Sequence, residues 1–230
     1  MSSLLRIKFL ICLGLAVLSF GCGEQDRFTG GQGNVERPLV YPQTVAARPK
    51  IIAFGDSLTA GFGLSETESY PYLLQQRLNA EGYDYEVVNA GVSGDTSLGG
   101  SERAEWTLEQ QGAKILILEL GANDMLRGMP PARMKANLES IIKKAQELNM
   151  KILLCGMFAA PTLGTEYQQE FNTAFPDLAD QYKTAFLPFP LENIAMKPEL
   201  NQGDGIHPNA EGTRMMADNI YNALLPLLEK

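Results

Sequence analysis

The stretch AKILILELG, residues 113–121, decides the fold class. Almost all of its side chains are apolar, which is typical of a strand that is covered on both faces of a parallel sheet. Helical patterns stand on either side of it, at 98–112 and at 131–150, and the second of these carries its apolar residues on one face. A buried strand between two helices indicates a βαβ arrangement.

The same alternation continues along the chain. Further strands are predicted at 50–55, 85–91, 151–158 and 183–189, and further helices at 69–82, 166–182 and 209–230. The helix at 166–182 is expected to break before Pro176, because proline has no N–H to donate. These elements predict an α/β domain, a three-layer αβα sandwich in which helices cover both faces of five parallel strands. Such sheets bind ligands at the carboxyl ends of their strands.

Chemically capable residues follow the predicted strands. GDSLTAG follows the first strand and places Ser57 at a strand-to-helix turn, and the second strand ends in NAGVSGDTS, with Gly94. The third runs into ELGANDM, with Asn123, and DGIHP at 204–208 precedes the last helix. We expect these four loops to meet at one edge of the sheet.

His207 is the only histidine of the chain and lies between Asp204 and Pro208. Imidazole is the base that works near neutral pH, and a serine hydroxyl needs such a base to become a nucleophile. Asp204 can accept a hydrogen bond from Nδ1 and so turn Nε2 toward Ser57. Pro208 suits the first position of the last helix and favours an extended His207. The pattern indicates a catalytic serine, base and orienting acid.

Three hydrogen-bond donors complete the predicted site. The N–H of Ser57 at a helix start, the N–H of Gly94 and the side-chain amide of Asn123 can face one developing oxyanion. Each residue alone has a simpler structural explanation, as a helix cap, a turn residue or a loop residue. Their joint position after separate strands favours acyl transfer.

The sequence predicts neither a metal nor a cofactor. Asp56, Asp95 and Asp124 are scattered, and with a single histidine the chain has no zinc-ligand spacing. A Mg²⁺ site of these carboxylates is the weaker alternative. The sequence contains neither a phosphate-binding glycine loop nor a G-x-S-x-G elbow. The absence of the elbow argues against the α/β-hydrolase family proper.

The four blocks GDSLTAG, GVSGDTS, GAND and DGIHP resemble those of the SGNH, or GDSL, hydrolases, in the same order. The resemblance implies a flavodoxin-like sheet of order 2-1-3-4-5. It also implies Ser57, His207 and Asp204 as the catalytic triad, and Ser57, Gly94 and Asn123 as the oxyanion hole. GDSLTAGFGL, VVNAGVSGDTS and DGIHPNAEG look most like the bacterial arylesterase and lysophospholipase–thioesterase branch. That branch implies hydrolysis of acyl esters or thioesters without a metal.

The loop GMFAAPTLGTEY, residues 156–167, is a candidate substrate contact. We expect Phe158 and Leu163 to form a wall for the acyl chain, with ordinary core packing as the alternative. Two other functions stay open at this point. One is an O-deacetylase of envelope carbohydrate or peptidoglycan with the same machinery, and the other is a non-catalytic lipoprotein that binds an envelope ligand.

The first 22 residues are predicted to be a signal peptide. Arg6 and Lys8 precede a short apolar run that ends at Cys22. The end of the run resembles a bacterial lipoprotein signal, in which that cysteine is acylated, although Ser19 stands where leucine is usual. Simple export and an uncleaved anchor are the alternatives. Residues 23–48 are predicted to be a flexible linker and 49–230 the hydrolase domain. The expected location is the envelope or periplasm, with the protein anchored through Cys22.

The net charge of the chain limits the class of partner that it can bind. The chain of 230 residues has a formal net charge of −8, which argues against a nucleic-acid partner because phosphate neutralisation needs a basic face. The expected partner is a small-molecule or lipid acyl ester, and we expect a monomer. Cys155 is the only cysteine beyond the linker and lies in the apolar run KILLCGM, so it is predicted to be a core residue.

Overall fold

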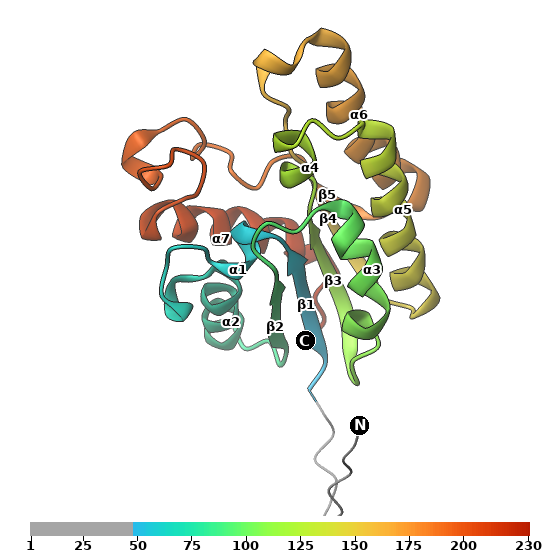
Figure 1. The fold of residues 1–230 in the computed structure, drawn as a ribbon. Helices are drawn as coiled ribbons and strands as arrows, with labels where there is room; N and C mark the ends of the chain where they lie inside the picture. The colour runs from blue at the N-terminus through green and yellow to red at the C-terminus, as the bar shows by residue number, and fades with distance from the viewer. Residues whose placement is uncertain (1–47) are drawn as a thin grey trace, which may run out of the picture. The chain divides into compact units, whose positions relative to one another are not determined.

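The structure, a computed structural model, describes residues 48–230, so the predicted signal peptide, Cys22 and nearly all of the linker lie outside the described residues. Five parallel strands form one sheet in the order β2-β1-β3-β4-β5 (Figure 1). This confirms the predicted α/β class and strand order. The strands are β1 (Lys50–Gly55), β2 (Glu86–Gly91), β3 (Ala113–Glu119), β4 (Lys151–Cys155) and β5 (Ala185–Leu187).

Helices cover both faces of the sheet, as Figure 1 shows. One face carries α2 (Tyr70–Ala80) and α7 (Ala210–Leu224), which pack on each other, and the other carries α3 (Ser97–Leu108), α5 (Pro131–Glu147) and α6 (Thr165–Tyr182). Two short helices, α1 (Ser57–Ala60) and α4 (Ala122–Leu126), begin at the carboxyl ends of β1 and β3. Four 3₁₀ turns complete the described part, at Glu66–Glu68, Pro161–Leu163, Pro198–Leu200 and Leu225–Leu227.

The apolar patterns of the sequence form the core. The stretch that decides the fold, β3, is fully buried from Leu116 to Leu118. The apolar side chains on one face of α5, including Met134, Leu138 and Ile141, are fully buried. Burial of each such side chain stabilises the fold by about 1.5–3 kcal/mol. Cys155 is buried at the end of β4 with a free thiol, which confirms its predicted place in the core.

The predicted break in α6 is wrong. The helix runs from Thr165 to Tyr182 with Pro176 inside it. An interior proline removes one backbone hydrogen bond and costs about 3 kcal/mol in an exposed helix. Here Phe175 and Leu178 on either side of the proline are buried in the core, and this packing holds both halves of the helix in line.

Different parts of the chain lie at the carboxyl and the amino ends of the strands. The carboxyl ends of the strands carry α1, α4 and the loops that were predicted to meet there. At the amino ends, Pro49 and Lys230 line one depression, and Lys151 of β4 pairs with Glu229, with Nζ and Oε1 2.6 Å apart. Both ends of the described chain therefore lie at the pole opposite to those loops.

Candidate active site

Ser57 is the first residue of α1 and follows β1 after a single residue, Asp56. Asp56 caps the helix, because its Oδ1 accepts the N–H of Leu58 at 3.1 Å. The Ser57 side chain is half-buried, and its Oγ lies 2.9 Å from Nε2 of His207. The structure thus brings together two residues that are 150 positions apart in the chain.

His207 is held by Asp204 on its other side. Nδ1 lies 2.7 Å from Oδ2 of Asp204, and Oδ1 of the same carboxylate accepts the N–H groups of Ile206 and His207, each at 3.0 Å. Gly205 has a φ of +75° at the turn between them. The hydrogen bond to His207 has the largest effect on the pKa of Asp204, and the two backbone N–H groups have the next largest. Together they lower this pKa to about 2. The carboxylate is therefore ionised near neutral pH, as the orienting role requires.

The predicted place of Pro208 at the first position of the last helix is wrong. Helix α7 begins only at Ala210 and is capped by the side chain of Asn209, so Pro208 lies before the helix. Asn201 and Pro208 form an antiparallel bridge, and Gln202 N–H donates to the carbonyl of His207 at 2.7 Å. This pairing fixes the histidine backbone.

The three predicted oxyanion donors line the same cavity as the imidazole. Gly94 has a φ of +82° in a turn that is closed by the N–H of Asp95 on the carbonyl of Val92, at 3.0 Å. A Cβ added there would meet only Arg127 within 4 Å, so the backbone angle is what demands glycine. Asn123 donates one amide hydrogen to Oδ2 of Asp56, at 3.0 Å, which leaves its second hydrogen free.

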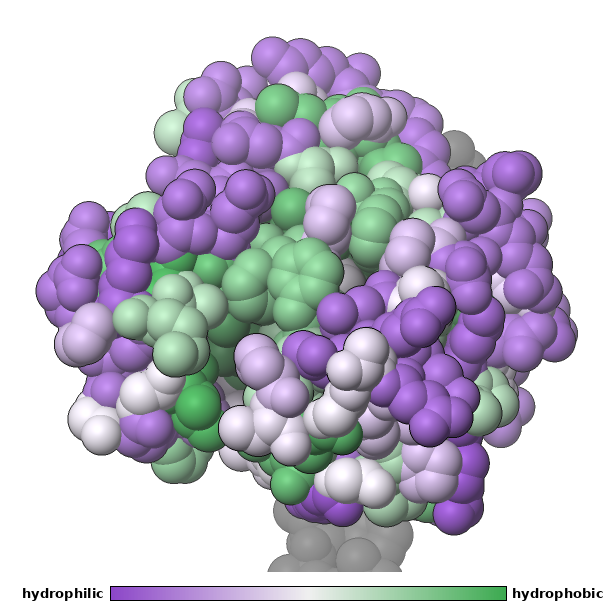
Figure 2. Space-filling model, turned by 90° about the horizontal axis from the view of Figure 1, so that it is seen from above, coloured by the Kyte–Doolittle hydropathy of each residue, from purple (hydrophilic) through white to green (hydrophobic). Residues whose placement is uncertain are grey.

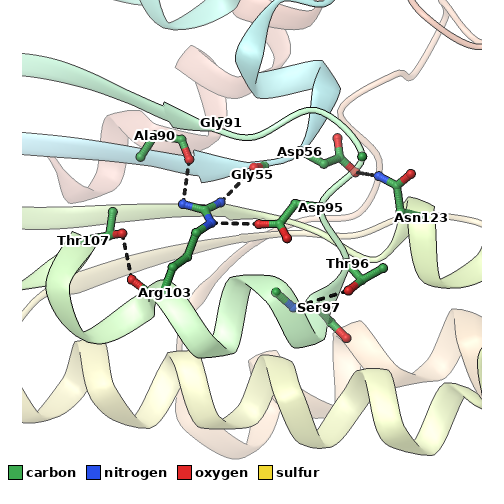
Figure 3. Close-up of polar contacts among 12 residues, drawn as sticks. Gly55, Asp56, Ala90, Gly91, Asp95, Thr96, Ser97, Arg103, Thr107 and Asn123 are labelled. Atoms are coloured by element: carbon green, nitrogen blue, oxygen red, sulfur yellow. Dashed lines mark hydrogen bonds and ion pairs between the residues drawn. The ribbon is translucent and has the colours of Figure 1, made fainter. Parts of the chain in front are cut away.

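Asp56 is the link between the serine and the asparagine. Its carboxylate is fully buried and accepts from the backbone of α1. It also accepts from the amide of Asn123, as Figure 3 shows. Burial raises its pKa to about 6, while the bonds from Leu58 and Asn123 lower it and keep the shift moderate. At neutral pH the group is therefore mainly a carboxylate that orients Asn123.

The acids that were weighed as a metal site have protein partners instead. Asp95 pairs with Arg103, Nε to Oδ2, at 2.7 Å, and Asp124 accepts both the N–H and the hydroxyl of Ser97 at 2.8 and 2.7 Å. Within residues 48–230, no three histidine, cysteine, aspartate or glutamate side chains gather in a way that could hold a metal ion. The structure uses these carboxylates to fasten the loops of the site.

A buried carboxyl group that sequence reasoning missed lies behind α1. Glu119, at the end of β3, accepts the hydroxyl of Thr59 at 2.9 Å, and Thr59 lies 3.2 Å from the hydroxyl of Tyr70. Burial has the largest effect on the pKa of Glu119 and the nearby Asp56 the next largest. Both raise this pKa well above its ordinary value and so favour the neutral carboxyl group. The signal was visible in AKILILELG, where this glutamate is the only acid and follows the apolar run from Ile115 to Leu118.

A cavity of about 320 Å³ opens beside Ser57 and His207. Figure 2 looks onto this face and shows apolar surface gathered in its middle, with hydrophilic residues around it. The apolar lining comes from several loops, and its side chains are Leu58, Phe62, Ala122, Met125, Leu126, Met157, Leu191, Ala195, Met196 and Ile206.

Phe158 and Leu163 are not among the residues that line this cavity. The ring of Phe158 packs against Phe189, with centroids 5.2 Å apart, and Leu163 lines a separate depression with Tyr167. The preceding residue of the same loop, Met157, does line the cavity.

A parallel α/β sheet with a hydroxyl, an imidazole and a carboxylate in one hydrogen-bonded chain at its carboxyl edge defines the class of serine hydrolases. The chain belongs to the GDSL-like lipase/acylhydrolase family, whose sequence model matches residues 53–215. This confirms the family predicted from the four blocks.

Similar proteins are named as enzymes that act on esters. The esterase TesA of Pseudomonas aeruginosa is 41% identical over 190 residues, which are 83% of this chain and 94% of that protein. A thioesterase 1/protease 1/lysophospholipase L1 of Escherichia coli is 34% identical over 183 residues, 80% of this chain and 86% of that protein. A crystal structure of TesA matches with a TM-score of 0.75 at 41% identity and covers 78% of this chain and 99% of that one.

Proposed function

We propose that this carboxylic ester hydrolase is a serine esterase that works through an acyl-enzyme on Ser57. His207 takes the hydroxyl proton as Oγ bonds to the substrate carbonyl carbon. The N–H groups of Ser57 and Gly94 and the amide of Asn123 hold the resulting oxyanion. The bond to the leaving alcohol or thiol then breaks, and His207 returns the proton to it. Water, activated by the same imidazole, releases the acid and restores the serine.

The single observation that carries this proposal is the chain of contacts from Ser57 Oγ to His207 at 2.9 Å and from His207 to Asp204 at 2.7 Å. The ionised Asp204 stabilises the imidazolium that forms when the proton moves. It also sets the tautomer that leaves Nε2 free to accept that proton.

The lining of the cavity supports an apolar acyl group as the part of the substrate that enters. Thioether and aliphatic side chains dominate it, and Met157, Leu191 and Ala195 come from loops that follow β4 and β5. Esters or thioesters with an acyl chain, including lysophospholipids, fit such a lining. A polar sugar would leave its hydroxyl groups without partners there, so the lining does not favour the deacetylase alternative.

An ester series tests the proposal. The purified protein is assayed on p-nitrophenyl esters of increasing chain length, on lysophospholipid and on an acetylated glycan. We expect hydrolysis of acyl esters and complete loss in Ser57→Ala, with an unchanged melting temperature. Turnover by Ser57→Ala would refute the serine mechanism. Strict preference for acetyl groups would favour the O-deacetylase. Failure of wild type to react with a fluorophosphonate would favour a non-catalytic binding protein.

We also propose that the protein is exported as a monomer and is anchored by a lipid on Cys22. The basic residues, the short apolar run and the cysteine at its end support this. No helix within residues 48–230 is long and apolar enough to cross a membrane. Labelled palmitate should enter the wild-type protein and not Cys22→Ser in expressing bacteria, and equal labelling of both would refute the anchor. Sedimentation of the purified protein tests the monomer.

A further inference from the structure

A largely buried arginine links the two strands that lead into the site. Arg103 of α3 donates Nη1 to the carbonyl of Ala90 at 2.9 Å and Nη2 to the carbonyl of Gly55 at 3.0 Å (Figure 3). Its guanidinium carbon lies 3.8 Å from the centroid of the Phe54 ring. The two carbonyls stand at the carboxyl ends of the paired strands β2 and β1, so one planar group bridges these ends.

The third contact of this guanidinium reaches the turn that carries Gly94. Nε donates to Oδ2 of Asp95 at 2.7 Å, and the two side chains are only 12% and 11% exposed. Asp95 directly follows Gly94, and its N–H closes the turn on Val92. The N–H of Val92 in turn donates to the carbonyl of Gly55 at 3.0 Å. The turn is thus attached to the end of β1 both directly and through Arg103.

We propose that Arg103 is a positioning residue that sets the place of the Gly94 N–H relative to Ser57. The inference rests on the proposed function, and Arg103 itself touches no reacting atom. Lysine cannot replace it, because a compact ammonium lacks the planar fork that meets three acceptors at once. Loss of a whole oxyanion donor typically costs about 100- to 1,000-fold in rate, so a displaced donor should cost at least about tenfold.

Arg103→Lys tests the proposal, with Arg77→Lys as a matched control. Arg77 also stacks on an aromatic ring, that of Tyr221 at 3.9 Å, and pairs with Asp218, but it lies between α2 and α7. Hydrolysis of p-nitrophenyl butyrate is measured per active site, after fluorophosphonate titration. Two inhibitors are compared: an alkyl trifluoromethyl ketone, whose adduct with serine places an oxyanion in the hole, and the corresponding alcohol, which forms no adduct.

For Arg103→Lys we expect kcat/KM and the affinity for the ketone to fall together, by at least about tenfold, while the affinity for the alcohol stays within about twofold. Arg77→Lys should change none of the three. A lower melting temperature of Arg103→Lys with unchanged kcat/KM and ketone affinity would show a purely structural role and overturn the proposal.

If Arg103→Lys does not fold, Asp95→Asn decides. This change removes the charge of the ion pair and keeps the shape of the side chain. A parallel loss of kcat/KM and ketone affinity supports the positioning role, and unchanged values overturn it. A wild-type protein that hydrolyses no ester would refute the proposed function instead. An active enzyme that is indifferent to these changes refutes only the role of Arg103.

Discussion

Replacing Asp56 by asparagine should make the enzyme slower and change how its stability depends on pH. The buried carboxylate accepts hydrogen bonds on both oxygens, from the N–H of Leu58 at 3.1 Å and from the amide of Asn123 at 3.0 Å. An asparagine side chain has a single oxygen, so it can accept from only one of them and turns its own N–H groups toward the other. Asn123 would lose its fixed orientation in the oxyanion hole.

The effect on stability follows from the pKa of Asp56. Burial raises this pKa from 3.8 to about 6, so the folded protein binds the proton more tightly than the unfolded chain does. Wild type is therefore favoured at low pH and loses this contribution as the pH rises from about 4 through about 6. A shift of about two pH units corresponds to about 3 kcal/mol. Asparagine does not titrate. The free energy of unfolding of the variant minus that of wild type should therefore rise by about this amount as the pH goes from below 4 to above 6.

The effect on catalysis follows from the lost bond to Asn123. A hydrogen bond to a charged group contributes about 1.5–3 kcal/mol, which corresponds to about 10- to 100-fold in kcat/KM. Urea unfolding at pH 4 and pH 7 measures the stability difference, and ester hydrolysis at pH 8 measures the rate. Asp218→Asn, at an exposed ion pair with Arg77, controls for the loss of one carboxylate. A stability difference that is flat with pH, or a variant as fast as wild type, would refute this reasoning.

Three further substitutions test the rest of the site. Asp204→Asn should lower kcat by at least about 1,000-fold in steady-state assays, because the amide cannot stabilise the imidazolium; a smaller loss would remove Asp204 from the triad. Glu119→Gln should leave kcat and the melting temperature unchanged at pH 7, since burial favours the neutral carboxyl group, which glutamine imitates, and a drop of more than about 5 °C would contradict that. Met157→Ser should lower kcat/KM on an octanoyl ester more than on an acetyl ester, whereas Phe158→Ser should affect both equally; the opposite ranking would make Phe158 the acyl contact.

The fold and the meeting of the four loops could be predicted because both depend on local patterns. Strands such as AKILILELG are apolar on both faces, and the residues with useful chemistry follow directly after them. A parallel sheet collects its carboxyl ends at one edge whatever the details of packing. Ser57 and His207 could therefore be expected in one place even though 150 positions separate them.

Other features depended on contacts that no local pattern contains. Arg103 bonds to carbonyls 13 and 48 positions away. Every residue has a backbone carbonyl, so the sequence does not show which ones a side chain will bind. The direction of a side chain after a strand ends is equally hidden, which is why Met157, rather than Phe158, lines the cavity. Pro176 shows that tertiary packing can override a local preference, because buried neighbours hold the helix through it.

The position of the two ends of the described part of the chain has a practical consequence. Pro49 and Lys230 line one depression at the amino ends of the strands, on the side of the sheet opposite to Ser57, where the C-terminus is marked in Figure 1. A solid support, a reporter domain or an affinity handle joined at either end of residues 48–230 would lie on the side of the sheet away from the active site. Engineers who wish to immobilise this domain can therefore choose the end by convenience, and capture on beads should preserve turnover per molecule.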